Sequence, residues 1–164
     1  MPGWLAPELA TAALAMAALA CVAAAAICDV RRFEIPDELS IALVVLAVLH
    51  GLLTPGFGWL SHVAAPAIVF AVGLLLFARG MMGGGDIKLL TAIAAWTGLG
   101  GLLPFLVGVS LSGGALALGL LLVRRAYAGR APRLRVLRPD APIPYAVAIL
   151  GGTLWWASLV WPRG

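Results

Sequence analysis

The sequence predicts an all-α protein that crosses a membrane several times. Hydrophobic residues make up 63% of its 164 residues and charged residues only 11%, against about 25% charged in an average soluble domain. A soluble chain of this length has too few polar side chains to cover so much apolar surface. In lipid, backbone polar groups must be paired within helices or a closed barrel, and the Ala- and Leu-rich runs lack the alternation of barrel strands. We therefore expect one membrane-embedded helical domain over residues 1–164.

Charged strips divide the chain into apolar runs. A helix needs about 20 apolar residues to cross the hydrocarbon core, and the first uncharged run, 9–28, has that length. It lacks the basic start of a signal peptide, so we interpret it as a retained span. The run 39–78 is twice as long and contains the turn signal Thr-Pro-Gly-Phe-Gly at 54–58, which predicts two spans.

The second half of the chain predicts three more spans. The run 89–123 is interrupted by Thr-Gly-Leu-Gly-Gly at 97–101, so we expect one short helix followed by a longer one. A last span runs from about 142 to 161. The predicted total is six transmembrane helices.

The basic residues predict the orientation. With six spans, the polar strips 29–38, 79–88 and 124–140 face one side and hold ten of the eleven Lys and Arg residues. The positive-inside rule makes that side cytoplasmic and both termini periplasmic, in a bacterial inner membrane. The six arginines of the loop 124–140 are interpreted as a topology determinant that contacts anionic lipid. The net charge of +4 therefore does not indicate nucleic-acid binding.

Two aspartates at the cytoplasmic border are candidates for chemistry. Asp29 follows the first apolar run, and Asp86 ends the segment Gly83-Gly84-Gly85-Asp86 between the third and fourth spans. Three glycines in a helix cost up to about 1 kcal/mol each, so this segment is predicted to be non-helical. Irregular backbone at membrane depth is tolerated only beside protein or a water-filled cavity, and glycine lets a substrate backbone approach closely.

These segments resemble the type IV prepilin peptidase family, whose members are GxGD intramembrane aspartyl proteases. The stretch 83–90, Gly-Gly-Gly-Asp-Ile-Lys-Leu-Leu, is similar to the family's GxGD-x-K-L-L motif. The stretch 29–37, Asp-Val-Arg-Arg-Phe-Glu-Ile-Pro-Asp, is similar to its D-x-R-x-x-x-I-P-N/D motif. The stretch 144–149 resembles a proline-containing segment before the family's last helix. The resemblance covers residues 29–149.

The resemblance implies an aspartic endopeptidase that cleaves the basic leader from type IV prepilins or pseudopilins at the cytoplasmic membrane face. It implies that Asp29 and Asp86 are the catalytic pair. The candidate supporting or substrate-binding residues are Gly83, Gly84, Gly85, Lys88, Arg31, Pro36, Asp37 and Tyr145. The expected partners are the prepilin and membrane lipid.

The length of the chain resembles the short family members that serve tight-adherence (Flp) pili. The larger members carry an additional cysteine-motif region and also N-methylate the new terminus. This sequence has no CxxC pairs, so methylation is not expected. No cofactor or metal is expected either.

Paired carboxylates suit peptide hydrolysis for a physical reason. Two carboxyl groups held close together cannot both ionise cheaply, so one of them keeps a proton. The ionised group can activate a water for attack on the scissile carbonyl. The protonated group can polarise that carbonyl and later protonate the leaving amine.

Structural roles compete with catalysis for several of these residues. Asp29 could simply end a helix and pair with Arg31 or Arg32. Asp86 could cap the fourth span, and Asp37 is interpreted as the N-cap of the second span. Lys88, the only lysine, could be a positive-inside anchor or a charge that acts on Asp86 or on the substrate.

Two other functional classes remain open from the sequence. One is a small transporter or proton-relay subunit, and the other is a non-catalytic subunit of pilus or secretion assembly. A carrier is expected to place ionisable residues near the middle of its spans, and this sequence has none there. The peptidase interpretation therefore leads.

Overall fold

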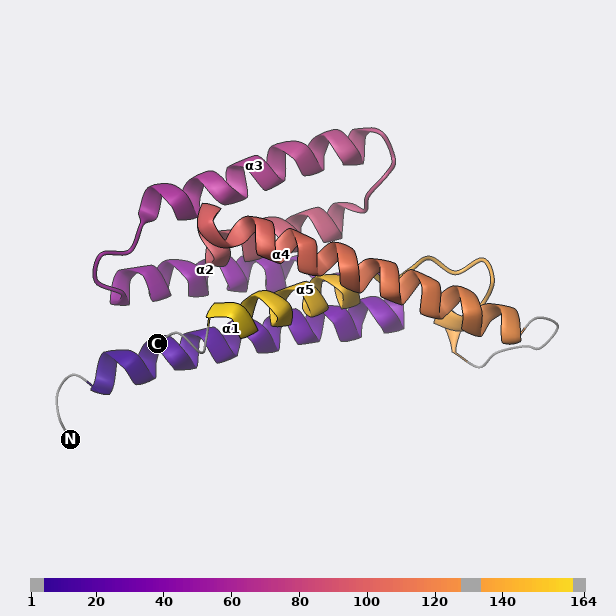
Figure 1. Ribbon diagram of the computed structural model, residues 1–164, viewed down its shortest axis with the longest axis horizontal. Coiled ribbons are helices and arrows are strands. Elements are labelled where there is room, and N and C mark those ends of the chain that lie inside the picture. Colours follow the sequence, from indigo (N-terminus) through magenta and orange to yellow (C-terminus); the bar gives the residue numbers. More distant parts are fainter. Residues whose placement is uncertain (1–4, 128–133, 161–164) are drawn as a thin grey trace.

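The computed structural model describes residues 5–127 and 134–160, and within them it contains helices and no strand (Figure 1). The helices are α1 (Leu5–Arg32), α2 (Asp37–Leu53), α3 (Trp59–Ala78), α4 (Gly84–Ala126) and α5 (Tyr145–Val160), with a short 3₁₀ helix, η1 (Arg135–Leu137). The all-α prediction is confirmed. Three stretches, Pro7–Arg32, Trp59–Ala78 and Gly84–Ala126, are long and apolar enough to cross a membrane, and Tyr145–Val160 is a shorter apolar helix.

The chain turns at both ends of α2, and the turn at its far end was predicted from the sequence. α2 ends at Leu53 and α3 begins at Trp59, so the predicted turn at 54–58 is confirmed. At the other end of the bundle, Phe33 closes α1 in the left-handed region (φ 57°). Its backbone N–H donates to the carbonyl of Asp29 at 2.8 Å, so the last turn of α1 stays helical up to this point.

α4 consists of two helices that meet at Gly98. A straight helix of 43 residues would be about 65 Å long, roughly twice the hydrocarbon thickness. Gly98 instead has φ 58° and ψ −176°, a conformation essentially restricted to glycine, and the chain reverses direction there (Figure 1). Ser61 accepts a hydrogen bond from the backbone N–H of Leu99 at 2.8 Å. The predicted division into a short and a long helix is confirmed, with halves at 84–97 and 99–126.

α4 is the centre of the packing. It contacts α2, α3 and α5, while α1 packs on α2 and α5. The largest fully buried side chains of the core are Phe105, Leu43, Leu89, Ile93, Ile149 and Val22. On the outside, large apolar side chains such as Leu60 and Leu103 are 84% and 71% exposed. An apolar exterior of this kind suits a lipid environment and not water.

Two local predictions are wrong. α4 begins at Gly84, so only Gly83 of the three glycines is outside the helix, in extended conformation (φ −72°, ψ 145°). The cost of glycine is tolerated because Gly85 packs closely on Ile35, and the first turn is closed by the carbonyl of Gly83, which accepts from the N–H of Ile87 at 3.3 Å. The N-cap of α2 is Pro36 and not Asp37, because the Asp37 carboxylate binds Lys88 instead of the free N–H groups of its own helix.

The described part of the arginine-rich loop packs against the end of α1. The Arg124 guanidinium donates to the carbonyls of Val136 (2.8 and 3.1 Å) and Pro142 (3.1 Å). The Arg135 guanidinium carbon lies 5.7 Å from the centroid of the Phe33 ring. These two arginines therefore have intramolecular partners. Arg130 and Arg133 of the predicted topology determinant, and Trp161 at the end of the last predicted span, lie outside the described residues.

Candidate active site

Asp29 is a buried carboxyl that joins two helices. It lies in the last turn of α1 and is only 7% exposed. Its Oδ2 accepts a hydrogen bond of 2.9 Å from the backbone N–H of Ala146, the second residue of α5. The first N–H groups of a helix have no partner within that helix, so a carboxylate is a favourable partner for them. Asp29 is thus bound to α5, while Arg31 and Arg32 are exposed.

Asp86 comes close to Asp29 from a separate helix. It is the third residue of α4, and its carboxyl faces back onto Gly83 just before the helix. Both side chains line the same two cavities. The two candidate catalytic aspartates are therefore brought together, although they come from helices that are distant in sequence.

The two cavities differ in character. The first, which we call the aromatic cavity, has a volume of about 440 Å³ and contains Phe33, Tyr145 and Met82 beside the aspartates. The second, the acidic cavity, has a volume of about 400 Å³ and contains Glu34 and Asp37 beside them, with the three glycines of 83–85. The aspartates thus line both a cavity with aromatic side chains and a cavity with two further carboxyl groups.

The three glycines have unequal packing. A Cβ atom on Gly83 would lie 3.0 Å from Asp86 Oδ2, and one on Gly85 would lie 3.3 Å from the Cβ of Ile35. A Cβ on Gly84 would make only an ordinary contact, 3.6 Å from the ring of Phe77. A side chain at the first or third glycine would therefore be packed tightly against the site, and one at the middle glycine would not.

Alanine substitutions should separate these roles. Gly83→Ala is expected to displace the Asp86 carboxyl, and Gly85→Ala to push back Ile35 beside the acidic cavity; a displacement of about 1 Å can cost about 100-fold in rate. Gly84→Ala is the matched control and should stay within about twofold of the unsubstituted protein. The measurement is kcat/KM for cleavage of a prepilin. Equal activity of all three variants would show that the glycines do not position Asp86.

The other predicted site residues divide into two groups. Tyr145 lines the aromatic cavity and Asp37 the acidic cavity. Lys88 does not reach Asp86, because its ammonium group donates to both carboxylate oxygens of Asp37, at 2.8 and 2.7 Å. Pro36 caps α2, and Arg31 is exposed at the end of α1; neither lines either cavity.

Several residues at the site were missed by the sequence interpretation. Ala146 contributes only its backbone N–H, and no residue type signals such a contact. Met82 and Ile143 enter the aromatic cavity from connections between helices, where apolar side chains are not distinctive in this composition. Glu34 was detectable, since it is an acidic residue inside the motif that begins at Asp29.

Comparisons with known proteins agree with this arrangement. The model of the type IV leader peptidase family matches residues 16–118, a range that contains both aspartates. A prepilin leader peptidase/N-methyltransferase of Aeromonas hydrophila is 29% identical over 142 residues, which cover 81% of this chain and 44% of that protein. The chain thus spans less than half the length of this relative. No solved structure matches significantly. By its sequence match, the chain belongs to the type IV leader peptidase family.

Proposed function

We propose that this protein is an aspartic endopeptidase that removes the leader peptide of type IV prepilins or pseudopilins, with Asp29 and Asp86 as its catalytic pair. One observation carries the proposal. Two carboxyl groups, one near the end of α1 and one at the start of α4, line the same two cavities. Flp-like prepilins are the first substrates to test, because the sequence resembles the short family members that serve such pili.

The chemistry follows from one proton shared by two carboxyl groups. The ionised aspartate takes a proton from a water as that water attacks the scissile carbonyl. The protonated aspartate donates a hydrogen bond to the carbonyl oxygen as negative charge develops there. In the second step a proton passes from the pair to the departing amine. The pair then returns to its starting state, with the leader released as a carboxylate.

The acidic cavity supports a basic leader as the substrate segment. Its lining includes four carboxyl groups, from Asp29, Glu34, Asp37 and Asp86, and no lysine or arginine. A peptide with several positive charges would be electrostatically complementary to this lining. Gly83, Gly84 and Gly85 also line this cavity, and they add no side chains to it.

We further propose six membrane spans in the bacterial inner membrane, with both termini periplasmic and the aspartates on the cytoplasmic side. The reversal at Gly98 supports this, since it lets the two halves of α4 act as separate spans. Figure 1 supports it too: the end of α1, the α3–α4 connection and the end of α4 lie at one side of the bundle. Basic side chains gather there, including Arg31, Arg79 and Arg125, as the positive-inside rule requires.

The direct test is mass spectrometry of a prepilin-like protein encoded in the same genome, purified from cells with and without this protein. We expect the leader to be absent only when the protein is present. The same spectrum reports N-methylation through the added mass of a methyl group, so the two activities are read separately. An intact leader in both samples, for every prepilin-like protein of that genome, would refute the proposed function.

A further inference from the structure

A groove between α2 and α3 runs along the membrane-facing side of the molecule. Two cavities of about 440 and 330 Å³ lie there, and they share Val44 of α2 and Thr91 of α4 as lining residues. The two cavities therefore lie next to each other, and we call them together the α2–α3 groove. Among the described residues, α2 and α3 hardly contact each other, and both pack on α4. Val44 and Phe70, on opposite walls, are 43% and 49% exposed, so the groove opens sideways toward lipid.

Two hydroxyl groups in the groove lack hydrogen-bond partners. Ser40 is only 7% exposed, and neither its Oγ nor the buried Oγ1 of Thr91 has a partner. Hydroxyls in helices usually bond to the carbonyl four residues earlier, as Ser110 and Thr153 do in this chain. Both oxygen atoms are buried behind the wall of the groove, and the surface of the groove itself is almost entirely apolar. The groove therefore offers an apolar surface to whatever occupies it.

The groove leads to the candidate catalytic aspartates. Asp37 lines both the groove and the acidic cavity that contains Asp29 and Asp86. At the opposite end the groove is closed by aromatic rings, since Phe57 stacks within 4.1 Å of His62 and 4.9 Å of Trp59, centroid to centroid. From position 37 to position 48, α2 is about 17 Å long. The groove can thus hold about three turns of a guest helix, with one end at the site.

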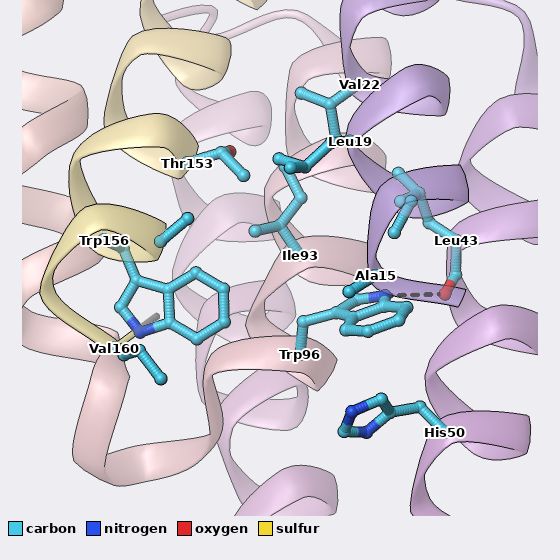
Figure 2. A pocket seen from close by; sticks show the side chains of 12 residues that line it. Ala15, Leu19, Val22, Leu43, His50, Ile93, Trp96, Thr153, Trp156 and Val160 are labelled. Carbon is cyan, nitrogen blue, oxygen red and sulfur yellow. Dashed lines mark hydrogen bonds between the residues drawn. The ribbon is translucent and has the colours of Figure 1, made fainter. Parts of the chain in front are cut away.

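A second apolar cavity is not connected to the candidate catalytic aspartates. It lies between α1, α2, α4 and α5 around Trp96 and Trp156, with a volume of about 210 Å³ (Figure 2). Trp96 is fixed there by a hydrogen bond of 2.9 Å from its Nε1 to the carbonyl of Leu43. None of its lining residues is shared with the aromatic or acidic cavity. A peptide bound there would not reach the aspartates.

We propose that the α2–α3 groove binds the apolar helix of the precursor, the segment of a prepilin that lies in the membrane while its basic leader stays in the cytoplasm. Beyond the end of the helix, the precursor chain passes the Asp37–Lys88 ion pair and enters the acidic cavity as an extended peptide. This inference rests on the proposed function, because it names the place where the membrane segment of the substrate lies.

Filling the groove tests the proposal. Val44→Trp places an indole in the space shared by its two halves, and Val107→Trp is the matched control, since Val107 has the same 43% exposure and lines neither half. With a full-length prepilin in proteoliposomes, we expect kcat/KM to fall at least tenfold for Val44→Trp and to stay within twofold for Val107→Trp. Equal activity of the two variants would overturn the proposal and leave the peptidase assignment intact.

Cross-linking tests the location without any need for cleavage. A photo-reactive amino acid at position 44 of the Asp86→Asn variant is expected to capture the apolar helix of the prepilin, and one at position 107 is not. Adducts with phospholipid alone at position 44 would assign the groove to lipid and overturn the proposal. Failure of the unsubstituted protein to cleave any prepilin would count against the proposed function and is a separate result.

Discussion

Asp29→Asn and Asp86→Asn should each abolish leader cleavage in a protein that still folds and inserts into the membrane. An amide cannot carry the shared proton, so both activation of the water and protonation of the leaving amine are lost. We expect kcat/KM for a prepilin to fall by at least about a thousandfold, since general acid–base catalysis alone contributes about 10²–10⁴-fold. The double variant should be no worse than either single variant, because residues that act as a unit have non-additive effects.

The controls for this result come from the surroundings of each carboxyl. Asp140 is exposed and lines neither cavity, so Asp140→Asn should retain full activity. Asparagine at position 29 can still accept the hydrogen bond from the N–H of Ala146. Asp29→Ala leaves that buried N–H without a partner and should also destabilise the fold by about 1–3 kcal/mol. Normal processing by both single asparagine variants would exclude the catalytic pair.

Gly152→Ala should disrupt the contact between α4 and α5 and lower both stability and activity. A Cβ atom at this position would lie 2.5 Å from the backbone nitrogen of Val109 and 2.8 Å from its Cα. Backbone atoms of a helix cannot move aside singly, so the two helices must separate. Overpacking of this kind costs about 1–3 kcal/mol. Activity should fall as well, because α5 carries the Ala146 N–H that holds Asp29.

Gly114→Ala is the matched control for that substitution. Gly114 is an exposed helical residue of α4, and a Cβ there would have no neighbour within 4 Å. Alanine at this position should be neutral or stabilise the helix by up to about 1 kcal/mol. Thermal unfolding in detergent, followed together with prepilin cleavage, measures both variants. Similar melting temperatures would mean that α4 and α5 do not need this close approach of small residues, a common feature of membrane helix pairs.

The features predicted correctly from the sequence are those that local chemistry determines. The turn at 54–58 and the reversal at Gly98 follow from residues that cannot continue a helix. The approach of Asp29 to Asp86 followed from family motifs and from the side of the membrane on which each was predicted. These signals come from residues that interrupt a helix or carry a charge, and such residues stand out in a chain that is mostly apolar.

The features that were missed depend on contacts between distant helices. The bond between Lys88 and Asp37 requires α2 and α4 to lie at a particular register, which no local pattern specifies. The helical start at Gly84 was hidden because glycine propensity is overridden where the packing of Gly85 on Ile35 fixes the backbone. The α2–α3 groove results from a missing contact between two helices, and absence of packing has no sequence signature.

The hydrogen bond between Ala146 and Asp29 has a stereochemical consequence for the proposed reaction. A backbone N–H is a donor only, so Oδ2, which receives it, acts as an acceptor throughout the cycle. A carbonyl oxygen accepts a hydrogen bond better than a hydroxyl oxygen, so when Asp29 is neutral this bond favours the tautomer with the hydrogen on Oδ1. Oδ1 is then the oxygen that exchanges a proton with the attacking water or with Asp86. The fold would thus select the oxygen of Asp29 that takes part in proton transfer, through the backbone N–H of Ala146.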